Sequence, residues 1–176
     1  KINNMYREVE GNLITMALNG NFDVIAHGVN CMCVQGSGLA PQMVEAFATD
    51  KFPMEKFDCR GDINKLGQID YQVRMISSEG IARTVFEGAA ILDMDDEPLV
   101  VVNAYTQYNY GRNHSDGDNK PVDYEAIALC MRKINHEFKG QHIGLPRIGC
   151  GLAGGDWEIV KGIIQTELKD CHVTVV

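Results

Sequence analysis

Two polar side chains in this sequence, His27 and Asp156, are candidates for acid–base chemistry because each stands near a glycine-rich loop. A histidine with an ordinary pKa of ~6.5 can serve as a base, an acid or a nucleophile at neutral pH. A carboxylate can orient the imidazole or activate a water molecule. Side chains of these two types can support acid–base chemistry without a metal. Structural roles are the alternative: an aspartate before a helix is commonly an N-cap, and a histidine at a strand end commonly bonds to a neighbouring loop.

The loop that precedes Asp156 has the composition of an anion-binding site. It runs Ile148-Gly149-Cys150-Gly151-Leu152-Ala153-Gly154-Gly155, between a short apolar strand predicted for 142–145 and a helix that starts after Asp156. Glycines let backbone N–H groups approach a phosphate closely, and a helix N-terminus favours negative charge. The loop lacks both the Gly-Lys-Ser/Thr ending and the Gly-x-Gly-x-x-Gly order of the standard nucleotide motifs. We therefore expect a different phosphate-binding family.

A second loop of the same kind follows the apolar strand predicted for 24–29. Asn30 ends that strand, residues 31–35 form a connector, and Gly36-Ser37-Gly38-Leu39-Ala40 leads into a helix predicted for 39–51. Two strand–loop–helix units suit a ligand bridged by a diphosphate, because one loop can lie on each side of it.

These two stretches resemble the macrodomain, the ADP-ribose-binding α/β/α module, and the motif order matches from about Val9 to Val176. The most similar branch holds the terminal ADP-ribose protein glycohydrolase and the yeast-type ADP-ribose-1''-phosphate phosphatase, together with compact phage and bacterial proteins. The resemblance implies that Asn12 and Leu13 lie towards adenine and that Asn30 orients ribose hydroxyls. The remaining ligand-binding residues that it implies are Gly36, Ser37, Gly38, Leu39, Ala40, Thr106, Ile148, Gly149, Cys150, Gly151, Leu152 and Ala153.

Departures from the family pattern separate its possible activities. Macrodomains usually have Gly-Asp-Ile-Thr where this chain has Gly-Asn-Leu-Ile-Thr; the amide of Asn12 can still accept a hydrogen bond from adenine but carries no charge. The glycohydrolase uses a lysine after the central strand and an aspartate after Gly-Leu. Here the first segment reads Tyr105-Thr106-Gln107, Ala153 follows Gly-Leu, and only the distant Lys120 remains. The phosphatase pattern fits better, with His27 and Asp156 as its catalytic pair.

The resemblance therefore implies a hydrolase that binds ADP-ribose and removes the terminal phosphate of ADP-ribose-1''-phosphate. Two alternatives remain: a reader that binds ADP-ribose or ADP-ribosylated protein without catalysis, and an enzyme that slowly hydrolyses ADP-ribosyl esters through a well-placed water. No cofactor is expected. No metal is expected either, because Cys31-x-Cys33 has no second pair at zinc-like spacing.

Composition indicates a single domain over residues 1–176 in the cytoplasm. A net charge of −8 and a pI near 5.0 argue against nucleic acid as the main partner, since polyanion binding usually needs a clustered basic face. No apolar run approaches the ~20 residues needed to cross a membrane, and the first residues show no signal-peptide pattern. The six cysteines are scattered, as is typical of reduced cytoplasmic thiols.

The pattern of hydrophobic residues predicts the elements that position these loops. Strands are predicted over 5–10, 24–29, 68–76, 81–86, 99–104, 142–145 and 172–176. Helices are predicted over 39–51, from the cap Asp123 to Gly140, and over 157–168. Alternation of strands and helices predicts an α/β fold, a three-layer α/β/α macrodomain sandwich around a central mixed sheet.

Overall fold

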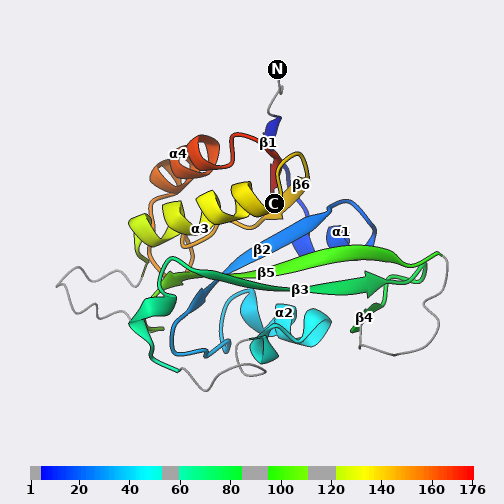
Figure 1. The fold of residues 1–176 in the computed structure, drawn as a ribbon, viewed down its shortest axis with the longest axis horizontal. Helices are drawn as coiled ribbons and strands as arrows, with labels where there is room; N and C mark the ends of the chain where they lie inside the picture. Colours follow the sequence, from blue (N-terminus) through cyan, green and yellow to red (C-terminus); the bar gives the residue numbers. More distant parts are fainter. Residues whose placement is uncertain (1–4, 53–59, 85–94, 111–121) are drawn as a thin grey trace.

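A seven-stranded sheet runs through the middle of the protein in the order β1-β7-β6-β2-β5-β3-β4 (Figure 1). The computed structural model describes residues 5–52, 60–84, 95–110 and 122–176. The neighbours from β1 through β5 in this order are parallel, whereas β3 is antiparallel to β5 and β4 to β3, so the predicted mixed sheet is confirmed. The strands are β1 (Tyr6–Glu8), β2 (Val24–Asn30), β3 (Ile69–Ile76), β4 (Ala82–Thr84), β5 (Glu97–Gln107), β6 (His142–Leu145) and β7 (His172–Val175).

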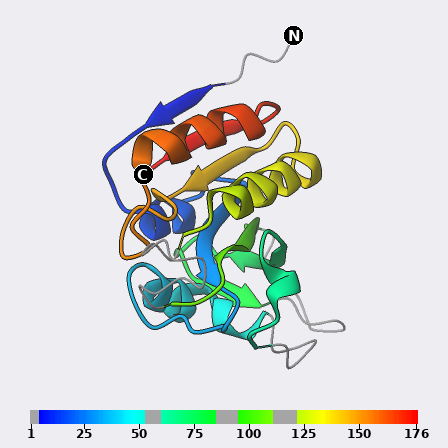
Figure 2. The ribbon, with the colours of Figure 1, turned by 90° about the vertical axis from the view of Figure 1, so that its left-hand side faces the viewer.

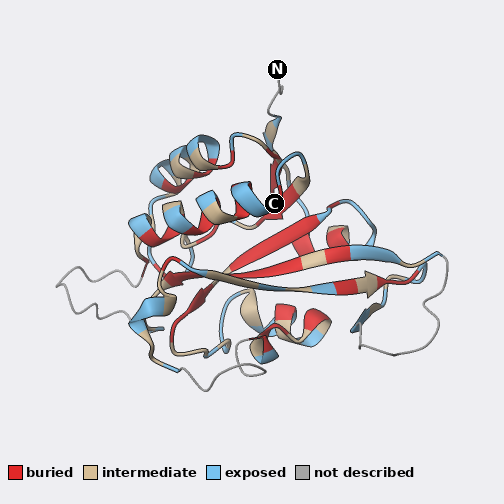
Figure 3. Cartoon of the chain, viewed as in Figure 1, coloured by how far each residue is buried: buried red, intermediate tan, exposed pale blue. Residues whose placement is uncertain are grey.

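Helices cover both faces of the sheet and create a separate core on each (Figures 1 and 2). Helices α1 (Leu13–Leu18) and α2 (Ala40–Phe47) pack on one face, and α3 (Tyr124–Glu137) and α4 (Trp157–Glu167) pack on the other. Successive residues of β2 alternate between the cores: Val24 and Ala26 lie under α3 and α4, and Ile25 lies against α1 and α2. The central strands are therefore buried on both sides (Figure 3), and the three-layer α/β/α prediction is confirmed.

The helix predicted over 39–51 is interrupted near its middle. Helix α2 ends at Phe47, Ala48 has the left-handed φ of 55°, and a 3-10 turn, η1 (Thr49–Lys51), follows. A left-handed alanine is unfavourable by roughly 1–2 kcal/mol, so tertiary contacts must compensate. After the left-handed residue Ala48, the side chain of Thr49 is completely buried.

Two further differences concern element lengths. The six-residue helix α1 was not predicted, because its sequence Leu-Ile-Thr-Met-Ala-Leu is too short and too uniformly apolar to show helical periodicity. Strand β5 is longer than the predicted 99–104 at both ends. Of the strand predicted over 81–86, the last two residues lie outside the described ranges, as does Lys120. None of the described helices is both long enough and apolar enough to cross a bilayer.

Candidate functional site

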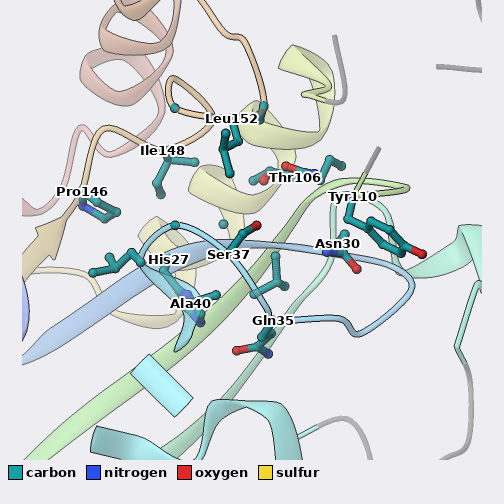
Figure 4. A pocket seen from close by; sticks show the side chains of 18 of the residues that line it. His27, Asn30, Gln35, Ser37, Ala40, Thr106, Tyr110, Pro146, Ile148 and Leu152 are labelled. Atoms are coloured by element: carbon teal, nitrogen blue, oxygen red, sulfur yellow. The ribbon is translucent and has the colours of Figure 1, made fainter. Parts of the chain in front are cut away.

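A cavity of about 240 Å³ opens between the two glycine-rich loops, where β2 and β5 end (Figure 4). The carboxyl ends of parallel strands are where open α/β sheets bind ligands. Most of the predicted ligand residues therefore meet around one space, although they come from distant parts of the sequence. Those that line the cavity are His27, Asn30, Ser37, Gly38, Leu39, Ala40, Thr106, Ile148, Gly149, Gly151, Leu152 and Ala153.

Five predicted site residues are not part of this lining. Gly36 and Cys150 are sequence neighbours of lining residues, and burial raises the pKa of the Cys150 thiol. Asn12 caps α1, its Oδ1 accepting the N–H of Thr15 at 3.0 Å, and it borders a separate depression beside α2. Leu13 belongs to the core under α1 and α2. The structure does not bring the predicted adenine contacts to the cavity.

The fifth of these, Asp156, caps helix α4. Its Oδ1 accepts the backbone N–H of Glu158 at 2.9 Å, and its own N–H donates to the Tyr124 hydroxyl at 3.0 Å. The side chain is exposed. The structure thus gives Asp156 the capping role that its position before a helix allows, and Asp156 and His27 do not line the same cavity.

Unused backbone donors from both loops border the cavity. The N–H groups of Ser37, Gly38, Leu39 and Ala40 donate to no acceptor among the described residues, and those of Gly151, Leu152 and Ala153 are equally free there. Ala40 opens α2, so the partial positive charge of that helix end adds to the first group. In Figure 4, Ser37 and Leu152 lie on the two sides of the opening. Such an arrangement can bind the oxygens of a diphosphate from two sides.

The floor of the cavity depends on the absence of a side chain at Gly28. A Cβ there would lie 2.8 Å from Thr106 Oγ1 and 3.4 Å from Ile148 Cγ2. A register shift places Val29 opposite Tyr105 and Asn30 opposite Gln107, which leaves Thr106 as the extra residue of β5. The Thr106 hydroxyl is buried without a hydrogen-bond partner. Glycine at position 28 therefore makes room for both neighbouring side chains.

His27 lies at the cavity wall but is almost fully buried, with 2% of its surface exposed. Its Nε2 is 2.7 Å from Asn103 Oδ1, while Asn103 Nδ2 donates to the Thr49 carbonyl at 2.9 Å. Because that second bond fixes the Asn103 amide, Nε2 carries the proton, and Nδ1 has no partner among the described residues. Desolvation lowers the His27 pKa to about 4, and the bond to Asn103 opposes this only in part. The imidazole is therefore neutral at neutral pH.

Asn30 stabilises the connector that leads to the first loop. Its Nδ2 donates to the Val34 carbonyl at 2.7 Å, and its Oδ1 accepts the Val34 N–H at 3.2 Å. An amide has one more N–H and one more lone pair than these bonds use, so Asn30 can still meet a hydroxyl-bearing ligand.

Eight lining residues were not among the predicted site residues: Gly28, Val29, Val34, Gln35, Gln107, Tyr110, Pro146 and Arg147. The Arg147 guanidinium lies over the Trp157 ring, 5.2 Å from its centroid, and 3.9 Å from Glu8 Oε1. Seven of the eight lie within two residues of a predicted site residue, and Tyr110 lies four residues after Thr106. That proximity was the available signal. Their burial and partners depend on elements that are distant in sequence.

Comparison with known proteins finds a relative by sequence. No protein-family model matches the chain. The uncharacterised 17.5 kDa protein from the tk-vs intergenic region of Enterobacteria phage T4 is 30% identical, over 96% of this chain and 93% of its own length.

Solved structures give the fold. The macrodomain of Mycobacterium tuberculosis DarG has a TM-score of 0.63 at 19% identity, covering 98% of this chain and 97% of its own. Thermosipho africanus DarTG, solved with ADP-ribose, has a TM-score of 0.64 at 18% identity, covering 99% of this chain and 42% of its own. A mutant Oceanobacillus iheyensis macrodomain, solved with ADPR, has a TM-score of 0.59 at 14% identity, covering 99% and 87%. This chain therefore belongs to the family of the phage T4 17.5 kDa protein, and its fold is that of the macrodomains.

Proposed function

We propose that this protein binds ADP-ribose in the cavity between its two glycine-rich loops. The proposal rests on two sets of unused backbone N–H groups, one on each side of the cavity. The first set comes from Ser37–Ala40 and the second from Gly151–Ala153. An acidic protein can hold an anion in this way, because backbone dipoles supply the positive ends without lysine or arginine. Two structures of the same fold contain the ligand, which supports the choice of ADP-ribose.

The substitution Gly38→Glu tests the proposal. Gly38 has a φ of +66° and no atom within 4 Å of an added Cβ, so a glutamate adds a carboxylate beside the loop amides. Like charges in a binding site cost several kcal/mol, so calorimetric titration should show ADP-ribose affinity reduced roughly 100-fold.

Gly140→Glu is the matched control. Gly140 also has a positive φ, +79°, and open space around it, but it follows α3 and does not line the cavity. Both variants carry the same backbone strain and the same added charge. Equal losses in the two variants, or unchanged affinity in Gly38→Glu, would refute the assignment of the cavity.

Hydrolysis of ADP-ribose-1''-phosphate is the second candidate function. It is favoured by His27, whose Nδ1 lone pair is unused and whose ring lies at the cavity wall. In this reaction a water oxygen bonds to phosphorus while the bond from phosphorus to the ribosyl oxygen breaks. The imidazole takes the proton from the water and then gives it to the leaving ribosyl oxygen, which restores the neutral imidazole. Because Nδ1 is out of solvent contact, His27 needs a local movement before it can reach that water.

Two conservative variants separate hydrolysis from binding. Gln at position 27 keeps a donor near the Nε2 position, and Asn at position 156 keeps a good helix cap while removing the charge. If the protein is the phosphatase, wild type should release phosphate from ADP-ribose-1''-phosphate, and His27→Gln should release much less while still binding ADP-ribose. Because Asp156 is an exposed helix cap outside the cavity lining, Asp156→Asn should keep its turnover, and a loss there as well would assign Asp156 to the reaction. Binding without release would leave a reader or an ester hydrolase, and release of ADP-ribose from an ester-linked ADP-ribosylated protein would identify the latter.

A further inference from the structure

A chain of buried hydrogen bonds connects the central strands to the first glycine-rich loop. His27 on β2 donates to Asn103 on β5, and Asn103 donates to the Thr49 carbonyl on η1. Gln35, directly before the loop, bonds to Thr49 twice: its Nε2 donates to the carbonyl at 3.2 Å, and its Oε1 accepts the Thr49 hydroxyl at 2.7 Å. Thr49 and Asn103 are fully buried and Gln35 is half-buried, so the bonds at Asn103 are shielded from competition with water and those of Gln35 are partly shielded.

Gln35 is the residue through which this series of hydrogen bonds reaches the loop. The next backbone donors, from Gly36 to Ala40, form no hydrogen bond to the described residues, and Gly36, Ser37 and Gly38 are exposed. On the other side of Gln35, Asn30 fixes Val34. The loop is therefore held at its entry by Asn30 and Gln35 and at its exit by the start of α2, with free amides between.

We propose that Gln35 is a positioning residue that holds the loop in its anion-binding shape before ligand arrives. The proposal rests on the function proposed above and adds a cause for the loop's shape. A site that is competent in only a fraction of free molecules binds more weakly by that fraction. Loss of the Gln35–Thr49 bonds lowers the competent fraction, so it slows association while the dissociation rate of the complex stays the same.

Gln35→Met tests this proposal, because methionine keeps the length and volume of glutamine and removes both bonds. Loss of two hydrogen bonds of ordinary strength corresponds to an affinity for ADP-ribose lower by roughly 5- to 30-fold. Stopped-flow binding should place this loss in the association rate. Hydrogen exchange of the ligand-free protein should show faster exchange at the hydrogen-bonded amides that flank the loop, those of Val34, Gln42 and Met43, and unchanged exchange in α3.

Two further variants keep the test specific. Thr49→Val removes the hydroxyl in a nearly equal volume, so it should lower ADP-ribose affinity less than Gln35→Met does. In the double variant the affinity should fall by less than about twofold beyond that of Gln35→Met, because the two substitutions remove one shared contact. Gln42→Met is the matched control, since Gln42 is exposed on α2 and does not line the cavity.

The outcomes that would overturn the proposal are distinct from failure of the proposed function. Wild-type affinity in Gln35→Met, or a loss confined to the dissociation rate, would exclude positioning; the latter would make Gln35 a direct ligand contact. If wild type binds no ADP-ribose, the proposed function fails, yet the exchange experiment still decides whether Gln35 holds the loop. Unchanged exchange at Val34, Gln42 and Met43 would refute it.

Discussion

The substitution His27→Gln should remove a large part of the pH dependence of this protein's stability. Burial lowers the His27 pKa from its ordinary 6.5 to about 4, so the folded protein resists protonation that the unfolded chain accepts. The stabilisation is therefore complete above pH 6.5 and is lost progressively as the pH falls through 4. With these two pKa values, proton linkage makes the free energy of unfolding about 2 kcal/mol lower at pH 5 than at pH 7.5.

Urea unfolding of both proteins between pH 4.5 and 7.5 measures this effect. Glutamine has no titrating group and keeps a donor for Asn103, so the difference in unfolding free energy between wild type and variant should shrink by about 2 kcal/mol from pH 7.5 to pH 5. His142, whose pKa burial and Arg7 also lower, titrates in both proteins and cancels in the difference. Parallel pH curves would show that His27 titrates normally and would refute the reasoning from burial. An ionisation near pH 6.5 in turnover that disappears in His27→Gln would contradict it as well.

Three other predictions follow from the contacts around the cavity. Gly28→Ala should lower ADP-ribose affinity roughly tenfold and stability by about 1–2 kcal/mol in thermal unfolding, because its Cβ meets Thr106 and Ile148. In the control Gly144→Ala the Cβ meets the Phe22 ring at 2.7 Å, so stability should fall while ADP-ribose affinity stays intact. Equal affinity in the two variants would contradict the placement of Gly28 at the cavity floor. Thr106→Val should raise the unfolding free energy by about 1 kcal/mol, because it removes a buried hydroxyl without a partner; a drop in melting temperature would show that the hydroxyl is satisfied. Arg147→Gln should weaken ADP-ribose binding about fivefold at low salt and less at high salt, and identical titrations would mean that the guanidinium stays with Glu8 and Trp157.

Local patterns in the sequence were sufficient to predict most of the fold. The β2 and β5 strands were recognisable because both faces are buried along most of each strand and the sequence is mostly apolar there. Helix α3 was recognisable from its apolar spacing and from the Asp123 cap, whose Oδ1 accepts the Ala126 N–H. The break at Ala48 was not, because alanine favours helix and the left-handed turn is stabilised by contacts made elsewhere.

The candidate site divides in the same way. Glycine-rich segments next to strand ends and helix starts indicated both anion-binding loops, because backbone donors depend on local chain geometry alone. The roles of individual side chains depended on their surroundings. Only the tertiary structure shows that His27 is buried and neutral and that Asp156 is occupied as a cap.

The sequence by itself determined which segments form strands, helices and phosphate-binding loops, because these depend on residues a few positions apart. Only the tertiary structure decided how Gln35, Thr49, Asn103 and His27 connect, since their bonds join residues 14, 54 and 76 positions apart. The physical reason is that desolvation and hydrogen bonding inside a core depend on which distant elements pack together, and hydrophobic periodicity carries no such information.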